Sequence, residues 1–412
     1  MKILLINHYA GGPQYGMEYR PYHMAQEWRR LGHDVTIVGA SYSHLRLRNP
    51  EPTQSKSMLM NGLGTIWLPT PSYRGNGVAR AVNIVEFARR LRAASGQLAR
   101  KLRPNLVITS STHPMDIYGG RRIARLNGGI WFHEVHDLWP LTLIELGGMP
   151  RWHPFVRLLQ RAEDQAYRTA DRVVSMLPAA LPYMEAHGLN PARFQYVPNG
   201  VALDDWQHPE PLPSPHSEVL GRLRAQSRFV VGYAGGFATS NDLESLLASQ
   251  SYLHRPDIHF VLVGDGDYRQ ELVTRYGGER VTFLPPVPKV AIPSLLECFD
   301  VCFVGYRRSP LYRFGVNPNK MFDYMMAARP IISAIAAAND PVSEARAGLT
   351  VAPEDPVAIA HAIELLAAEP ASERRARGER ARELVRERYD YRVLAARVLE
   401  GLPGAEAIRT PH

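Results

Sequence analysis

Several features that mark common protein classes are missing from this sequence. Cys298 and Cys302 are the only cysteines among 412 residues, which is too few for a disulfide framework and indicates buried thiols in a reducing compartment. No apolar run reaches the roughly 18–20 residues that a membrane-spanning helix needs. The N-terminal residues, MKILLIN, lead into polar residues and glycines without a cleavage-like site, so we expect a first strand there rather than a signal peptide. The sequence therefore predicts a soluble, globular, cytoplasmic protein.

A dinucleotide fingerprint is missing as well. The segment after the first predicted strand, GGPQYGMEYRP (11–21), does not match G-x-G-x-x-G. The second predicted strand ends in Gly39-Ala40-Ser41, where a nicotinamide-binding domain would have an acidic residue. Binding of a nicotinamide cofactor is therefore disfavoured. The chain also has no recognised nucleic-acid-binding motif, and we expect no nucleic-acid partner.

Positive charge is concentrated in the first half of the chain. Residues 1–190 carry 23 Lys and Arg against 13 Asp and Glu, whereas residues 191–412 carry 25 against 27. The segment 80–104 combines apolar residues at helical spacing with Arg and Lys on the remaining face. Such a helix can rest on an anionic membrane surface or meet phosphate-bearing partners. The alternative is the solvated face of an ordinary packing helix.

Short apolar segments alternate with helix-length segments in two series, which indicates parallel sheets covered on both faces. The chain is also long enough for two domains. The predicted strands of the first series are 2–7, 34–40, 65–70, 105–111, 130–136, 172–177 and 194–198. Those of the second are 229–234, 259–264, 281–284, 301–306, 330–335 and 348–352. Between them, the proline-rich segment 197–218 predicts a linker. The predicted fold is α/β, with two doubly wound, Rossmann-like domains.

The tetrapeptide YAGG occurs twice, at 9–12 and 233–236, each time after a short apolar run and before a segment with helical periodicity. Gly11 and Gly12, and likewise Gly235 and Gly236, allow the backbone to approach a ligand closely, and a helix start nearby favours an anion. Ligands of doubly wound sheets bind at the carboxyl edge of the strands. We therefore expect a phosphate or diphosphate at these turns. Tight turns without a ligand are the alternative.

The segment FGVNPNKMFDYMMAARP (314–330) has the composition of a helix start. Asn317 can cap the helix, Pro318 suits its first position, and Lys320 falls in the first turn. A lysine there is unfavourable against the helix dipole unless an anion lies between it and the free N–H groups. Asp323 lies one turn further along the same face and could accept hydrogen bonds from hydroxyls. The alternative is a surface ion pair between Lys320 and Asp323.

With these motifs in place, the sequence resembles the family 4 glycosyltransferases, which are retaining, use nucleotide sugars and have the GT-B fold. Within that family it looks most similar to bacterial surface-polysaccharide enzymes described as fucosaminyl or N-acetylhexosaminyl transferases. The resemblance covers nearly the whole chain. The stretches that carry it are NHYAGGPQYGMEYRPYHMAQEWRRLGHDVTIV (7–38), FHEVHDLWP (132–140), YVPNGV (196–201), GYAGGFATSNDLESLL (232–247), FVLVGDGDYRQEL (260–272), VTFLPPVP (281–288), CFDVCFVGY (298–306) and NKMFDYMMAARPII (319–332).

The resemblance implies two domains that face each other across a cleft. Residues 1–200 would form the acceptor-side domain, with the C-terminal helix 386–412 packing back on it. Residues 201–385 would form the domain that binds the nucleotide-sugar donor.

The family pattern has two glutamates eight positions apart at the donor site, and this chain departs from it. The second glutamate corresponds to Asp323, expected to hold the ribose hydroxyls, and the first corresponds to Gly315. Backbone groups of Gly315 and Val316, or the side chain of Asn317, are expected to take the place of the missing carboxylate.

The family also has an Arg/Lys pair shortly after the second glycine turn, which FATSND (237–242) lacks. Lys320 and Arg313 are therefore expected to neutralise the diphosphate. By the same resemblance, Gly11 and Gly12 would approach the donor phosphate and the acceptor from the opposite wall.

Two further motifs complete the expected site. By the resemblance, Asp265 would lie near the nucleoside, and HEVHD (133–137) would supply the residues that contact the reacting sugar, His136 and Asp137. The alternative for His136 and Asp137 is a structural hydrogen-bonded pair. The DGD at 265–267 resembles a metal-binding D-x-D, but its position after a strand predicts turn geometry and helix capping, so we expect no metal.

The resemblance implies transfer of a sugar, with retention, from a UDP-linked donor of the N-acetylhexosamine type to a glycan or a polyprenyl-diphosphate-linked acceptor. The expected context is bacterial polysaccharide or O-antigen biosynthesis, with no cofactor. The basic N-terminal domain would bring the protein to the inner face of the membrane. The alternatives are a non-hydrolysing UDP-sugar epimerase and a catalytically silent nucleotide-sugar-binding protein.

Overall fold

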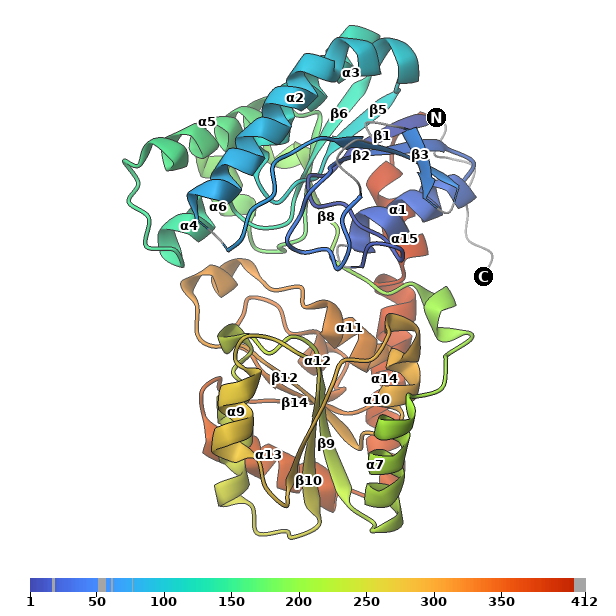
Figure 1. The fold of residues 1–412 in the computed structure, drawn as a ribbon, viewed down its shortest axis with the longest axis vertical. Coiled ribbons are helices and arrows are strands. Elements are labelled where there is room, and N and C mark those ends of the chain that lie inside the picture. Colours follow the sequence, from blue (N-terminus) through green and yellow to red (C-terminus); the bar gives the residue numbers. More distant parts are fainter. Residues whose placement is uncertain (17–18, 51–56, 61, 76, 404–412) are drawn as a thin grey trace. The chain divides into compact units, whose positions relative to one another are not determined.

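The computed structural model describes residues 1–16, 19–50, 57–60, 62–75 and 77–403 (Figure 1). The chain divides into two compact units. Unit 1 comprises Met1–Asn199 and Tyr391–His412, and unit 2 comprises Gly200–Asp390. The expected domain boundary at residue 200 lies at this division, whereas the return to unit 1 comes at Tyr391 and not at 386. Residues 404–412 of the predicted C-terminal helix lie outside the described part of the chain.

The sheet of unit 1 has the strand order β3-β4-β2-β1-β5-β6-β7-β8. Its strands are β1 (Lys2–Ile6), β2 (Asp34–Ala40), β3 (Ser57–Met60), β4 (Leu63–Leu68), β5 (Leu106–Thr109), β6 (Ile130–Val135), β7 (Arg172–Ser175) and β8 (Phe194–Tyr196). All neighbours pair in parallel except β3, which pairs antiparallel with β4. The main helices are α1 (Tyr19–Arg30), α2 (Val78–Leu102), α3 (Ile117–Asn127), α4 (Leu141–Glu145), α5 (Pro154–Thr169) and α6 (Leu181–Ala186). The sequence predicted every strand of this sheet except β3.

The sheet of unit 2 is parallel throughout and has the order β11-β10-β9-β12-β13-β14. Its strands are β9 (Phe229–Ala234), β10 (Ile258–Val263), β11 (Val281–Leu284), β12 (Val301–Gly305), β13 (Ile331–Ala334) and β14 (Gly348–Thr350). The helices are α7 (Ser214–Ala225), α8 (Leu243–Ala248), α9 (Arg269–Tyr276), α10 (Ile292–Leu296), α11 (Asn319–Met326), α12 (Pro341–Glu344), α13 (Pro356–Ala368) and α14 (Ala371–Arg388).

The expected linker 197–218 is wrong in its second part. Residues Leu203–Trp206 form a 3₁₀ turn, and α7 begins at Ser214. Pro213 occupies the N-cap position and Pro215 lies in the first turn, where a missing N–H costs nothing because that group has no partner in the helix. Prolines that suggested an irregular segment therefore start a helix.

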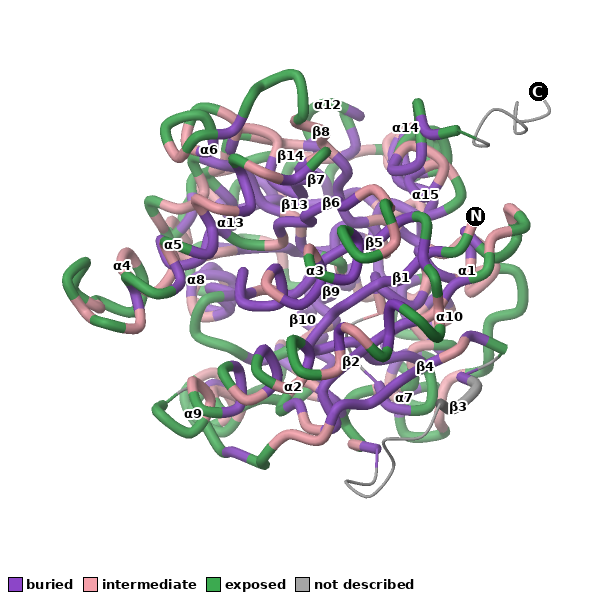
Figure 2. Tube along the Cα trace, turned by 90° about the horizontal axis from the view of Figure 1, so that it is seen from above, coloured by how far each residue is buried: buried purple, intermediate pink, exposed green. Residues whose placement is uncertain are grey.

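Both faces of the second sheet are buried, which explains its nearly continuous apolar strands. Along β9, Val230 and Ala234 belong to the core on one face, and Val231 and Tyr233 belong to the core on the other. Figure 2 shows strands such as β1, β9 and β10 as buried segments, whereas helices such as α4 and α9 contain exposed stretches. The carboxyl ends of these strands carry the loops in which the candidate site lies.

The C-terminal helices divide between the two units. In unit 2, α14 packs against α11. In unit 1, α15 (Tyr391–Leu399) packs against α1, where Trp28 Nε1 donates a hydrogen bond of 3.0 Å to the Ala395 carbonyl. Among the described residues, no helix is both long and apolar enough to span a bilayer.

The space around two helical glycines of unit 2 predicts opposite effects of replacing them with alanine. A Cβ at Gly378 would lie 1.9 Å from the Ala328 carbonyl oxygen, whereas a Cβ at Gly221, in α7, would meet nothing within 4 Å. Alanine normally stabilises a helix by about 0.5–1 kcal/mol over glycine. We expect Gly221→Ala to raise the free energy of unfolding in urea, and Gly378→Ala to lower it by about 1–3 kcal/mol through overpacking. Equal shifts in the two variants would contradict this packing.

Candidate active site

The second YAGG turn forms one wall of a pocket in unit 2. The N–H of Gly235 donates to the Val263 carbonyl at 3.0 Å, and the N–H of Phe237 donates to the Asp265 carbonyl at 2.8 Å. The loops after β9 and β10 therefore lie backbone against backbone. A Cβ at Gly264 would come within 1.9 Å of the Gly235 carbonyl oxygen, so this approach requires glycine.

No helix starts directly at either YAGG turn, which corrects the expectation of a nearby helix N-terminus. After Gly236, a 3₁₀ turn covers Thr239–Asn241 and α8 begins at Leu243. Gly12 is followed by a tight turn, in which its carbonyl accepts from the N–H groups of Tyr15 and Gly16, and the described part of α1 starts at Tyr19. Any anion at these glycines would meet loop backbone.

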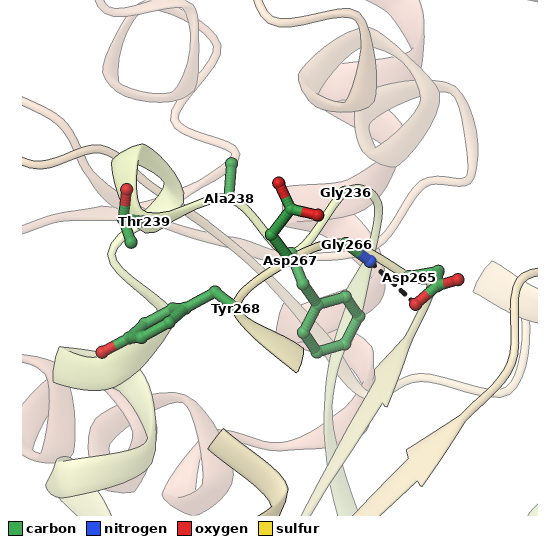
Figure 3. A pocket seen from close by; sticks show the side chains of 8 residues that line it. Gly236, Ala238, Thr239, Asp265, Gly266, Asp267 and Tyr268 are labelled. Carbon is green, nitrogen blue, oxygen red and sulfur yellow. Dashed lines mark hydrogen bonds between the residues drawn. The ribbon is translucent and has the colours of Figure 1, made fainter. Parts of the chain in front are cut away.

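The pocket beside the second turn has a volume of about 550 Å³ (Figure 3). It is lined by two loop segments, Gly236–Thr239 and Asp265–Tyr268. Asp265 and Asp267 are exposed, and an Asp265 carboxylate oxygen accepts a hydrogen bond of 2.9 Å from the Gly266 N–H. The predicted capping role of this DGD is wrong, because Tyr268 holds the N-cap position of α9 without a side-chain cap.

Lys320 lies next to this pocket, near the start of α11. Its Nζ donates to the Tyr233 hydroxyl at 2.8 Å and to Asn241 Oδ1 at 2.9 Å, and it lies 4.6 Å from the centre of the Tyr233 ring. Both partners in turn donate to the Gly236 carbonyl, at 2.7 and 2.8 Å. A Cβ at Gly235 would be 3.0 Å from Lys320 Cε. The fold thus brings together Gly235, Gly236 and Lys320, which the sequence named separately.

The Lys320 side chain is half-buried, and the two side chains that its Nζ contacts, Tyr233 and Asn241, are neutral. Burial lowers the pKa of Lys320 to about 7. The alternative of a Lys320–Asp323 ion pair is not formed. Asp323 instead accepts from Lys289 Nζ with both carboxylate oxygens, at 2.8 and 2.7 Å, and its side chain is only 14% exposed. An anion placed beside Lys320 would provide the negative charge that its neutral neighbours do not provide.

The loop before α11 differs from its predicted arrangement. The Gly315 N–H donates to the Tyr312 carbonyl, and the Val316 N–H donates to Asn339 Oδ1 at 2.8 Å. Asn339 Nδ2 donates back to the Val316 carbonyl at 2.9 Å. The N–H groups expected to replace the missing glutamate are therefore already used within the chain.

The cap of α11 and the contacts of Arg313 also differ from expectation. The helix begins at Asn319 with Pro318 at the N-cap and no side-chain cap, so the predicted cap at Asn317 is displaced by one position. Arg313 is exposed, its guanidinium lies 4.3 Å from the centre of the Phe314 ring, and it donates to the Pro310 carbonyl. These contacts are local and do not involve Lys320.

In unit 1, Glu134 organises the residues around His136. Glu134 is buried at the end of β6, forms an ion pair of 2.7 Å with Arg20 and accepts a hydrogen bond from the Ser110 hydroxyl. Burial alone would raise the pKa of Glu134, but Arg20 and His136 outweigh it and hold that pKa well below its usual range. The carboxylate is therefore ionised at neutral pH.

The Glu134 carboxylate also fixes the orientation of the His136 ring. Nε2 of His136 lies 3.2 Å from a Glu134 oxygen and 3.0 Å from the Ser110 hydroxyl. A carboxylate only accepts hydrogen bonds, so it favours the tautomer with the proton on Nε2 and leaves the Nδ1 lone pair available. Sequence reasoning named His136 and Asp137. Asp137 is exposed, and no contact ties it to Glu134 and Ser110 in the described part of the chain. Glu134, within the same HEVHD motif, was missed.

The first glycine pair is buried within unit 1. A Cβ at Gly12 would lie 2.7 Å from Met60 Sδ, and the carbonyl of the neighbouring Ala10 accepts from Arg46 Nε at 2.7 Å. Gly11 and Gly12 are both buried. Close packing accounts for glycine at position 12 without a ligand.

A cluster that could ligate a metal lies elsewhere in unit 1. Within the described residues, the group with suitable spacing comprises Glu163, Asp164 and His187. Glu163 accepts from the hydroxyls of Tyr167 and Tyr183, each at 2.9 Å, and burial raises its pKa to about 8. Both carboxyl oxygens of Glu163 are thus already hydrogen-bonded within the chain. The aspartates of the DGD motif do not belong to this cluster.

The depressed pKa of Lys320 predicts a pH-dependent effect of Lys320→Met. Between a pKa of about 7 in the folded chain and 10.5 in the unfolded one, the unfolded chain binds more protons, so this group makes stability rise with pH. The variant lacks that dependence. Relative to wild type, it should be most stabilised near pH 6–7, and this advantage should shrink by roughly a few kcal/mol toward pH 10. Urea unfolding across this pH range measures the effect, with Lys101→Met as the exposed control. The burial of Lys320 is contradicted if the difference in free energy of unfolding from wild type is independent of pH for both variants.

Comparison with known families and structures agrees with this architecture. The model of a glycosyl transferase 4-like domain matches residues 15–200, and the model of glycosyl transferases group 1 matches residues 228–369. A probable glycosyltransferase, WbjE of Pseudomonas aeruginosa, is 23% identical over 278 residues, which cover 66% of this chain and 68% of that protein.

Solved structures match along almost the whole chain. Sucrose-phosphate synthase of Thermosynechococcus elongatus has a TM-score of 0.72 at 18% identity, over 97% of both chains. HepE of Anabaena, solved in complex with UDP-glucose, has a TM-score of 0.67 at 16% identity, over 97% of this chain and 99% of that one. At these identities the likeness concerns the fold. Together with the two domain models in their chain order, it shows that this chain is a glycosyltransferase of the GT4-like group and has the GT-B fold.

Proposed function

We propose that the protein transfers a sugar, with retention of anomeric configuration, from a UDP-linked N-acetylhexosamine-type donor to a glycan or polyprenyl-diphosphate-linked acceptor in bacterial polysaccharide biosynthesis. The observation that carries the donor assignment is the half-buried Lys320 ammonium beside the glycine turn, which forms no ion pair with a carboxylate of the described residues. The complex of the structurally similar HepE with UDP-glucose supports a uridine nucleotide.

In this proposal the donor diphosphate lies between Lys320 and the first N–H groups of α11. Tyr233 and Asn241 hold the Lys320 Nζ in place before the ligand arrives, so little reorganisation is needed as negative charge develops on the leaving diphosphate. The helix N-terminus adds a favourable dipole. These groups supply the required positive charge themselves, and we propose that transfer needs neither a divalent metal nor a cofactor.

Two carboxylates are proposed to contact the nucleoside. Asp323 can accept hydrogen bonds from ribose hydroxyls while it keeps its ion pair with Lys289, because a carboxylate has about four acceptor positions. Asp265 lines the pocket beside Gly236 and is exposed there. The two hydrogen bonds from Lys289 fix the orientation of the Asp323 carboxylate.

Donor binding should be coupled to proton uptake. In the free protein, Lys320 loses its proton above a pH of about 7, and an adjacent diphosphate favours the protonated form. Affinity for the nucleotide therefore falls as the pH rises above this value. His136, oriented by Glu134, is proposed to contact the reacting sugar, while the leaving phosphate helps to remove the acceptor proton.

The donor site can be tested by thermal unfolding with UDP, GDP, ADP and their common sugars, with EDTA present throughout. We expect selective stabilisation by uridine nucleotides, loss of this stabilisation in Lys320→Ala, and no loss in the exposed control Lys101→Ala, because a ligand that binds only the folded state raises its stability. Absence of any nucleotide effect, or an equal effect in Lys320→Ala, would sink the assignment. Formation of an epimer without acceptor would instead favour the epimerase reaction.

The role of Glu134 predicts a loss of rate without a loss of donor affinity. Glu134→Gln should lower kcat for sugar transfer by about 10–100-fold, since it disturbs the orientation and tautomer of His136. His136→Ala should cost at least as much, and the exposed control Glu185→Gln should keep wild-type kcat. Because Glu134→Gln also breaks the ion pair with Arg20, folding is checked by thermal unfolding and donor binding by calorimetry. A folded Glu134→Gln protein with unchanged kcat would show that this network is structural.

A further inference from the structure

A second pocket lies in unit 1 along helix α3. This helix packs against both α2 and α5, and Figure 1 shows it beside α2. The pocket has a volume of about 530 Å³, similar to that of the pocket in unit 2. Gly119 and Gly120 let α3 sit deep between its neighbours. A Cβ at Gly119 would come within 2.4 Å of Leu91 Cγ, and one at Gly120 within 2.3 Å of Thr109 Cγ2.

Arginines dominate the lining of this pocket, which we call the arginine groove. Its lining residues are Arg92 from α2, Gln165 from α5, and Ile117, Tyr118, Arg121, Arg122, Arg125 and Leu126 from α3 and its start. A fifth guanidinium lies nearby. Burial raises the pKa of Tyr118, and the charge of Arg161 opposes that rise. The groove contains no acidic side chain.

The four arginines of the groove lack anionic partners. Elsewhere on α2, Glu86 pairs with both Arg89 and Arg90, which shows the usual pattern of a solvated helix face. In the ranges that the structure describes, Arg92, Arg121, Arg122 and Arg125 form no ion pair with any carboxylate. The helix dipole accounts for Arg125 in the last turn of α3, but not for Arg121 and Arg122 further back.

We propose that the arginine groove is a binding site for a phosphate-bearing anion, distinct from the donor site. Guanidinium groups present several N–H donors in a plane that matches two phosphate oxygens, and like charges gathered without carboxylates repel until an anion neutralises them. The proposal does not rest on the donor assignment, because its residues all lie in unit 1 and none belongs to the Lys320 site.

The phosphate can be carried by a lipid or by a soluble molecule, and the two sources are separable. Calorimetry with inorganic pyrophosphate tests the soluble form. Co-sedimentation with phosphatidylcholine vesicles, with and without phosphatidic acid, tests the lipid form. Each is measured on wild type, on Arg122→Glu/Arg125→Glu, and on Arg375→Glu/Arg386→Glu. The last variant makes the same charge change at exposed positions of α14 in unit 2.

We expect at least one probe to bind wild type and the α14 control, and to bind Arg122→Glu/Arg125→Glu at least about tenfold more weakly, because the charge-assisted hydrogen bonds of these arginines are lost and carboxylates repel the anion. This binding should persist in Lys320→Met and weaken with added salt. A response to pyrophosphate alone identifies a soluble ligand, and a response to phosphatidic acid alone identifies a lipid. Arg122→Gln/Arg125→Gln replaces the charge-reversal variant if that variant does not fold.

The proposal is overturned if neither probe binds wild type, or if the groove and α14 variants lose binding equally, because the effect would then reflect net charge alone. It is also overturned if pyrophosphate binding disappears in Lys320→Met, because the only phosphate site would then be the donor site. If the wild-type protein binds no nucleotide but binds a probe at the arginine groove, the donor assignment is wrong and the groove proposal stands.

Discussion

The close approach of two loops in unit 2 determines the geometry of the candidate donor site. Gly264 lies so near the Gly235 carbonyl that no side chain fits between them, and main-chain hydrogen bonds from Gly235 and Phe237 fix the two loops to each other. This contact aims the Gly236 carbonyl toward Tyr233 and Asn241, which in turn hold Lys320. A bulkier residue at position 264 would separate the loops and release the lysine together with the pocket wall.

The position of the Lys320 ammonium among neutral groups also favours the binding of an anion. Taking an ammonium out of water is costly, and two neutral hydrogen bonds with a partly facing aromatic ring return only a fraction of that cost. The folded protein meets the cost by letting Lys320 lose its proton near neutral pH. Glu134 shows the opposite solution, because its buried carboxylate faces Arg20 and stays charged without a ligand. This contrast agrees with the proposed roles, in which Lys320 binds the anionic ligand and Glu134 orients His136.

Much of the fold and part of the site could be predicted from the sequence. Short continuous apolar segments, alternating with helix-length segments, predicted every strand except β3. The sequence of β3, SMLM, is short and follows polar residues, so it does not stand out as a strand. Lys320 could be named from the sequence because a lysine in the first turn of a helix is unfavourable unless an anion lies beside it. The glycine turn could be named because a glycine pair after a strand lets a ligand approach the backbone closely. Lys289, Asn241 and Asn339 were not, because their roles depend on contacts with residues 34, 79 and 23 positions away. The arginines of α3 were missed for the same reason, since the groove exists only once three helices have packed.

The glycine at position 315 suits the conformation of its loop, so the absence of a glutamate there is linked to other features of the loop. Its φ of +107° lies in a region that costs an L-residue on the order of 1–3 kcal/mol, and the following Val316 is held on both sides by the amide of Asn339. A glutamate placed there would strain this loop or pull Val316 away from Asn339. The missing carboxylate and the clamp by Asn339 therefore form one structural solution. Under the proposed function, the donor hydroxyls that the missing glutamate would have contacted must then be met by other groups, and restoring the glutamate alone would not restore the family's geometry.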